Sequence, residues 1–174
     1  MKRIVIASVV MMLLSALAAQ AQTPPGPEHK KLGVLIGTWM NEGKDEATPF
    51  GKGGAYQATE TCAWFTGEYQ VVCDSEGSGY AGNIKGHMLV AYSVEKKHFL
   101  ALKITSDGSS GLATGRVDGS DWTWTWASPP IGGKTYQFRL LVKYPSPNEY
   151  TYKLEFSEDG KSWKLYGEGK SAKR

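Results

Sequence analysis

Histidine and cysteine, which supply many protein metal ligands, are scarce in this chain. Its 174 residues include three histidines and two cysteines. His29, His87 and His98 are spread along the sequence and show none of the short spacings that metal-binding motifs use. We therefore expect no metal and no other cofactor.

Motifs for catalysis and nucleotide binding are also missing. The chain has no Gly-x-Ser-x-Gly elbow of the kind that exposes a serine nucleophile. Residues 77–82 (GSGYAG) fit the spacing of a dinucleotide fingerprint, but that fingerprint works only where its glycines open a helix. Here Asn83-Ile84-Lys85 leads into a predicted strand. We expect a glycine-rich loop at the rim of the fold and no bound nucleotide.

The start of the chain has the pattern of a cleavable signal peptide. Lys2 and Arg3 precede an apolar run from Ile4 to Ala19, and Ala19-Gln20-Ala21 has the small-x-small pattern that signal peptidase cleaves. The apolar run is short for a membrane span, and no stop-transfer pattern follows it. We predict that residues 1–21 are removed, that the protein is periplasmic or secreted, and that the mature chain is not inserted in a membrane.

The mature chain lacks an excess of charge of either sign. Removal of Lys2 and Arg3 leaves 18 basic against 17 acidic residues, so the formal charge falls from +3 to +1. A nearly neutral chain without basic runs argues against nucleic acid and anionic membrane surfaces as partners. The sequence leaves the oligomeric state open.

The two cysteines gain a specific meaning in an exported chain, because an oxidising compartment favours disulfides. Residues 67–68 (Gly-Glu) have the composition of a two-residue hairpin turn. Pairing outward from Thr66 opposite Tyr69 brings Cys62 opposite Cys73. Directly opposed residues on antiparallel strands lie within disulfide range. We predict a Cys62–Cys73 disulfide.

Helical periodicity is nearly absent. Pro27 and the spacing of Leu32, Leu35 and Ile36 predict one short helix within the N-terminal segment 22–36. Residues 37–174 alternate in period two and have no helices that could carry parallel crossovers. Two packed sheets are an alternative, but the meandering order favours closure. We predict an all-β domain over 37–174: an antiparallel up-and-down barrel of about ten strands after one short helix.

The expected strands of this barrel are Thr38–Lys44, Gly54–Phe65, Tyr69–Glu76, Ile84–Ser93, His98–Thr105, Gly111–Val117, Asp121–Ala127, Thr135–Tyr144, Glu149–Ser157 and Trp163–Gly169.

Several short motifs resemble known families. Gly37-Thr38-Trp39, after the short helix, resembles the Gly-x-Trp start of the lipocalin barrel. Segments 67–69 (GEY), 73–77 (CDSEG), 92–93 (YS) and 157–163 (SEDGKSW) resemble a secreted bacterial domain-of-unknown-function family with a lipocalin-like (calycin) barrel. The resemblance covers residues 27–170 and implies that fold without an agreed activity. Lipocalins cover this tryptophan with an arginine late in the last strand, whereas the mature chain has arginine only at 116, 139 and 174.

Three tryptophans gather in one predicted strand. Trp122, Trp124 and Trp126 alternate with two threonines, so all three lie on one face of the strand. They could fill the barrel core, line a ligand cavity or form an exposed platform for sugars. Buried indole N–H groups need partners, which favours a roomy or wet interior. Trp64 and Tyr92 are further candidate walls of such a cavity.

Glu60 is the candidate polar contact for a ligand. The hairpin register places it on the same face as Cys62 and Trp64, so it points into the barrel. A buried carboxylate must pair or take up a proton. Glu60 could pair with Lys103 or Arg116, make a structural hydrogen bond, lie at a wet rim or meet a polar ligand group.

The function favoured by these patterns is non-catalytic binding of a small apolar or aromatic molecule inside a secreted β-barrel. Closed barrels of about this size can enclose one ligand. One alternative is a small isomerase or hydrolase that uses Glu60 as its base. Another is an interaction module that presents aromatic side chains to glycans or envelope proteins. The sequence identifies neither the ligand nor the biological process.

Overall fold

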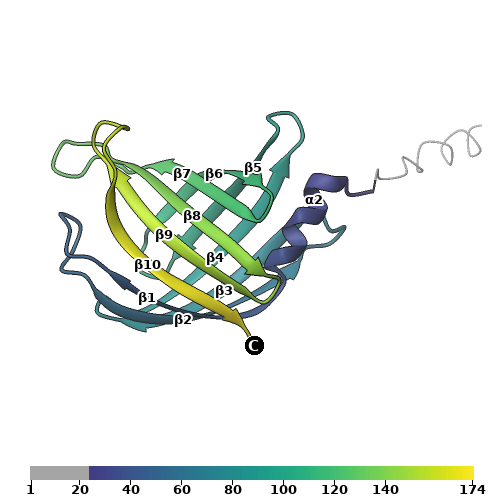
Figure 1. Ribbon diagram of the computed structural model, residues 1–174, viewed down its shortest axis with the longest axis horizontal. Helices are drawn as coiled ribbons and strands as arrows, with labels where there is room; N and C mark the ends of the chain where they lie inside the picture. Colours follow the sequence, from purple (N-terminus) through teal and green to yellow (C-terminus); the bar gives the residue numbers. More distant parts are fainter. Residues whose placement is uncertain (1–23) are drawn as a thin grey trace, which may run out of the picture.

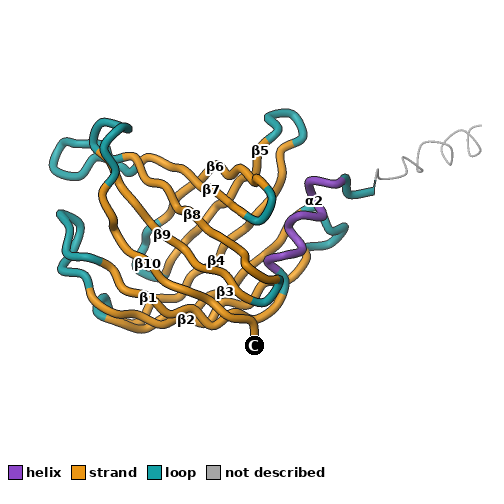
Figure 2. Tube along the Cα trace, in the orientation of Figure 1, coloured by secondary structure: helices purple, strands orange, loops and turns teal. Residues whose placement is uncertain are grey.

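Ten strands close into a barrel in the computed structural model, which describes residues 24–174 (Figures 1 and 2). The strands are β1 (Gly37–Asp45), β2 (Gly54–Trp64), β3 (Gln70–Gly79), β4 (Gly82–Ser93), β5 (His98–Thr105), β6 (Ser110–Asp118), β7 (Asp121–Ala127), β8 (Gln137–Ser146), β9 (Glu149–Ser157) and β10 (Lys164–Lys173). A helix, α2 (Pro27–Lys31), and a 3-10 turn, η1 (Leu32–Leu35), precede them. The predicted antiparallel barrel with one short N-terminal helix is confirmed. The predicted signal peptide, residues 1–21, lies outside the described residues.

The barrel has the up-and-down order that the sequence predicts. Each strand pairs antiparallel with its neighbours in the chain, and β1 also pairs with β10. This closing ladder runs from Trp39 opposite Lys173 to Asp45 opposite Gly167. Closure gives hydrogen-bond partners to the backbone N–H and C=O groups of the first and last strands, which would otherwise be exposed edges.

The barrel has two different ends, because successive strands alternate in direction. The end that we call the helix end carries α2 and the connections 65–69, 94–97, 119–120 and 147–148. The other end, which we call the mouth, carries the connections 46–53, 80–81, 106–109, 128–136 and 158–163. In Figure 1 the helix end lies at the right and the mouth at the left.

The helix and the 3-10 turn close the helix end. Pro27 begins α2, a position where its missing N–H and fixed φ are favourable. The His29 ring packs edge-on against Tyr69 and Tyr92, with centroids 5.2 and 5.6 Å apart. Leu32 is fully buried against the inner faces of the strands. Among residues 24–174, no helix is long and apolar enough to span a bilayer.

Side chains that point inward form two apolar clusters. The buried residues of the helix-end cluster are Leu32, Cys62, Val71, Cys73, Val90, Phe99, Ala101, Trp122, Trp124 and Val142. The mouth cluster consists of Tyr136, Phe138 and Phe156. Phe50, from the 46–53 connection, packs edge-on against Tyr136 and Phe156. Aromatic rings thus partly cover the mouth on the side of β8 and β9.

A lysine covers the tryptophan that begins the barrel. The Lys173 ammonium lies 4.7 Å from the centroid of the Trp39 ring, because β1 and β10 pair these two residues. The indole is buried, and its N–H donates a 2.8 Å hydrogen bond to the Leu35 carbonyl. The cover that lipocalins take from an arginine is therefore provided here by a lysine, through a cation–π contact.

The prediction of a glycine-rich rim loop over residues 77–82 is wrong. β3 and β4 continue their ladder through Ser78 opposite Asn83 and Gly79 opposite Gly82, which leaves only residues 80–81 as the turn. Glycine suggested a loop because it is common in turns, yet Gly77, Gly79 and Gly82 all lie within the paired strands. Among them Gly82 has a positive φ of 92°, which a turn residue at this position requires.

The hairpin that carries the cysteines has the predicted register but a longer connection. The Phe65 amide donates to the Gln70 carbonyl, so residues 66–69 form the loop. Gly67 and Glu68 both have positive φ within it. The register survives because two additional unpaired residues, one on each side, do not shift the alignment of the strands.

Candidate functional site

The inner face of β3 to β6 carries small residues near the mouth. Ser75 and Gly77 on β3, Gly86 on β4 and Gly111 on β6 occupy inward positions in the alternation of their strands. A Cβ atom placed on Gly111 would meet no atom within 4 Å, and its φ is not positive. The wall is therefore open beside Gly111, where larger residue types fit without backbone strain.

The tryptophans of β7 adjoin this open wall. Register places Trp126 next to Ala113 of β6. Trp122 and Trp124 stack with ring centroids 5.8 Å apart and an interplanar angle of 20°. Trp126 stacks on Phe138 of β8 at 5.4 Å and 7°. One side of the interior is therefore aromatic, and the adjoining side carries several small residues together with Lys103.

The three indoles share one face but differ in depth. Trp122 and Trp124 are 4% and 9% exposed, and Trp126 is half-buried toward the mouth. Because all three rings point inward, this strand presents no outward platform for sugars. Trp122 packs against Phe99 in the helix-end cluster at 5.0 Å. Trp126 is the indole of this set that a molecule entering at the mouth would meet.

Glu60 lies on the inner face of β2, between Trp39 of β1 and Ser75 of β3. Burial raises the pKa of its carboxyl group, and the Lys103 ammonium opposes that rise. Burial also raises the pKa values of Tyr144 and Tyr150, with the Glu60 charge as a further cause. Glu60 therefore keeps its proton to a higher pH than an exposed glutamate.

The two basic residues predicted as partners of Glu60 lie on opposite faces of the wall. The Lys103 Cε atom is 3.4 Å from the point where a Gly86 Cβ would lie, so its side chain runs along the inner wall. Arg116 is exposed on the outer face of β6, opposite Thr123 of β7. A Glu60–Arg116 pair is ruled out by the alternation of β6.

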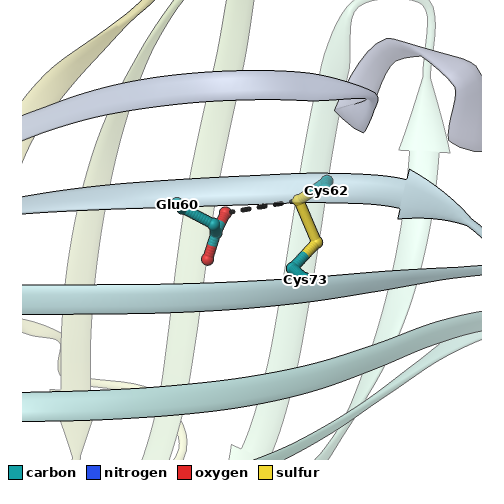
Figure 3. Close-up of side chains that lie close together, drawn as sticks. All are labelled: Glu60, Cys62 and Cys73. Carbon is teal, nitrogen blue, oxygen red and sulfur yellow. Dashed lines mark hydrogen bonds between the residues drawn. A yellow bond between two sulfur atoms is a disulfide. The ribbon is translucent and has the colours of Figure 1, made fainter.

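A disulfide joins Cys62 and Cys73 across β2 and β3, with their Cα atoms 4.0 Å apart. The Glu60 carboxyl group lies beside it, with Oε1 3.9 Å from Cys62 Sγ (Figure 3). A disulfide sulfur has no proton to donate, so this approach is a van der Waals contact. The disulfide and the carboxyl group together form one short stretch of the inner wall.

The same three residues resemble a metal site by distance alone. One possible ligand atom from each of Glu60, Cys62 and Cys73 lies within 4.8 Å of the others. Cysteine binds metals as a thiolate, and both sulfurs here belong to the disulfide. In this oxidised form only the carboxylate could act as a ligand, so the cluster does not fit a metal ion.

Trp64 and Tyr92 lie apart from the open wall. Trp64 contacts η1 at Gly33, where its Cζ2 atom is 3.6 Å from the point where a Cβ would lie. The Tyr92 ring packs on Phe99 at 5.0 Å. Both side chains therefore belong to the helix end. The six predicted ligand residues do not form one site. Strand alternation specifies which face of the sheet each side chain occupies, but not how far along the barrel it lies.

Tyrosines form polar contacts inside the barrel that the sequence analysis missed. The Tyr150 hydroxyl donates a 2.6 Å hydrogen bond to Asn41 Oδ1. At the mouth, the Tyr80 hydroxyl donates to Asp45 Oδ2 at 2.7 Å. The signal available was the alternation of Tyr150 with Tyr152 along β9, which places both hydroxyls inward.

A groove of about 1100 Å³ is lined by residues of β1–β3 and β8–β10. Many of its lining side chains point outward and form ion pairs with one another. Lys170 lies 2.8 Å from Glu42, and Lys153 lies 3.5 Å from Glu168. None of the six predicted ligand residues lines this groove, so it is separate from the site that the sequence predicts.

Two solved structures have the same fold. Rv2717c from M. tuberculosis aligns with a TM-score of 0.58 at 12% identity, over 86% of this chain and 99% of that one. The S-type phycobiliprotein lyase CPES from Guillardia theta aligns with a TM-score of 0.56 at 12% identity, over 84% and 92%. Identities this low establish a shared lipocalin-like barrel and nothing about activity.

Sequence comparison leads to a family. None of the curated proteins matches the chain. The profile of DUF1579, described as a protein of unknown function, matches residues 24–172. The resemblance to a lipocalin-like family of unknown function is thereby confirmed, and the chain belongs to the DUF1579 family.

Proposed function

We propose that this barrel binds a small molecule with an apolar or aromatic body, reached through the mouth. The body would lie beside Gly111, with Trp126 as its aromatic neighbour and Glu60 as a polar contact deeper inside. Trp122 and Trp124 support this wall from within the core, and Trp64 and Tyr92 close the helix end.

The open wall at Gly111 is the observation that carries the proposal. A strand position without a side chain weakens a sheet, so glycine in a strand needs a reason such as close approach of another group. Gly115 has such a neighbour in Trp124, whereas Gly111 has no atom within 4 Å of its Cβ position. A ligand supplies the missing neighbour.

Glu60 supplies the polar part of the proposed site. Binding sites of small molecules are mostly apolar, with a few polar groups that fix orientation. A carboxyl group whose pKa is raised by burial donates a hydrogen bond while it keeps its proton and accepts hydrogen bonds after it loses it. It therefore suits a ligand that carries one polar group.

The test fills the open wall. Gly111→Leu places a side chain in the empty space, whereas Ser110→Leu on the outward side of the same strand is the matched control. The neutral dye N-phenyl-1-naphthylamine is titrated while tryptophan emission is followed. We expect saturable changes in the native protein and in Ser110→Leu, and at least about tenfold weaker binding in Gly111→Leu. Equal binding by all three proteins would contradict the proposed site.

Catalysis by Glu60 is the second candidate function. A raised carboxyl pKa beside a solvent-reachable wall is what general acid–base chemistry uses. Glu60→Gln separates the two functions, because the amide keeps the shape and polarity but cannot transfer a proton. Loss of turnover with retained dye binding would favour an isomerase or hydrolase, and retained turnover would exclude Glu60 as its base.

Export to the periplasm or the medium is part of the same proposal. The disulfide supports an oxidising compartment, because cytosolic reductants keep most thiols reduced. The signal pattern of residues 1–21 supports it independently. Intact-mass analysis of protein recovered from the periplasm tests both, since cleavage after Ala21 fixes the expected mass.

A further inference from the structure

The inner wall carries a lysine close to the proposed ligand. Lys103 alternates with the buried Ala101 on the inward face of β5, but unlike Ala101 it is exposed to solvent. Its Cε atom lies over Gly86, 3.4 Å from the point where a Cβ of that glycine would lie. The stem therefore follows the inner wall, and the side chain remains exposed to solvent.

No carboxylate of the described residues lies within 4.0 Å of the Lys103 ammonium. Two lysines on the outer face have such a partner. Lys143 lies 3.2 Å from Asp121, and Lys170 lies 2.8 Å from Glu42. Exposed lysines such as Lys164 also lack a carboxylate partner among residues 24–174, but Lys103 differs from them in running along the inner wall.

The groups that face this wall leave it positive. Burial raises the pKa of Glu60, so this carboxyl group is a weaker counterion for Lys103 than an exposed glutamate would be. Tyr144 and Tyr150 face Glu60 from β8 and β9, and burial raises their pKa values as well, so they stay neutral. Ser75 adds only a hydroxyl group. An anion of the ligand would complete the missing ion pair.

We propose that the ligand is an organic carboxylate, with its carboxylate group on Lys103 and its apolar body beside Gly111 and Trp126. This inference rests on the proposed binding function and names the chemical class of its ligand. The ion pair forms at a partly wet site, so it contributes selectivity among ligands more than affinity.

Charge at Glu60 sets the pH dependence of this pairing. As the pH rises through the pKa of Glu60, its new negative charge repels the bound carboxylate and competes for Lys103. Affinity for a carboxylate should therefore fall with rising pH. In Glu60→Gln the carboxylate should bind equally well across that range, because the neutral amide never gains the charge.

Three probes with one shared body test the ligand class: naphthalene-2-carboxylate, naphthalene-2-carboxamide and 2-naphthylmethylamine. Dissociation constants are measured by calorimetry at mildly acidic pH. We expect the carboxylate to bind about tenfold more tightly than the amide, and the amine to bind most weakly. Lys103→Met should remove the preference for the carboxylate while amide binding stays. Lys103→Arg should retain the preference, and Lys143→Met on the outer face should change nothing.

The outcomes separate this inference from the function on which it rests. If the three probes bind equally, if the amine binds best, or if Lys103→Met leaves the preference unchanged, the assignment of a carboxylate is wrong while binding itself stands. If neither these probes nor N-phenyl-1-naphthylamine binds, the proposed function fails and the ligand class fails with it.

Discussion

The indole of Trp124 lies directly on the backbone of Gly115. Its Cζ3 atom is 2.5 Å from the point where a Cβ of Gly115 would lie, closer than any real Cβ contact. The two residues are opposite one another on β6 and β7. Glycine at 115 is therefore what allows the tryptophan to lie flat against the wall, and the stack of Trp124 on Trp122 depends on it.

Gly115→Ala should displace this ring and lower the free energy of unfolding by about 1–3 kcal/mol, the usual effect of overpacking. Urea denaturation measures the change, and near-ultraviolet circular dichroism reports the displaced indole. Gly111→Ala is the matched control, because its new methyl group enters open space. Equal stability of the two variants would show that the Trp124 ring is not held against Gly115.

Removal of the disulfide should destabilise the protein without changing its fold. The bridge closes a loop with a sequence separation of 11, for which the chain-entropy model gives about 3 kcal/mol. Cys62→Ala/Cys73→Ala should show this loss in urea denaturation. In the native protein, alkylation before and after reduction should reveal two thiols only after reduction. Free alkylation beforehand would contradict the bridge.

Lys173 should stabilise the barrel through Trp39 by its charge as well as by its stem. Lys173→Met retains most of the stem but loses the cation–π contact. Its free energy of unfolding should therefore be lower by about 0.5–1 kcal/mol. Lys173→Arg should retain the stability, because a guanidinium group makes the same contact. If the methionine variant is as stable as the native protein, the ammonium group contributes nothing.

The face of each strand could be predicted from the sequence, whereas depth along the barrel could not. Period two correctly placed Glu60 and Trp126 inside, and the hairpin register correctly opposed the cysteines. The same alternation cannot tell that Tyr92 lies at the helix end, because depth depends on how far each strand is displaced along its neighbours. Lys173 was missed because cation–π contacts need only a cation, and the resemblance directed attention to arginine.

Glu60 should make the stability of the protein depend on pH. Its pKa is raised in the folded state, so the folded protein binds this proton more tightly than the unfolded chain does. The resulting stabilisation is present below the ordinary glutamate pKa and is lost as the pH rises through the folded-state pKa. Urea denaturation across this range should show the decline in the native protein and not in Glu60→Gln. Parallel curves would contradict the raised pKa.

Native mass spectrometry of the exported protein shows whether the barrel holds a ligand, because it detects a bound molecule without knowledge of its identity. The protein is recovered from the periplasm and sprayed intact, together with Gly111→Leu. We expect an added mass of one small organic molecule, lost on collisional activation and absent from Gly111→Leu. A native protein that carries no such mass, and that gains none when incubated with naphthalene-2-carboxylate or N-phenyl-1-naphthylamine, would contradict the claim that this barrel binds a ligand inside.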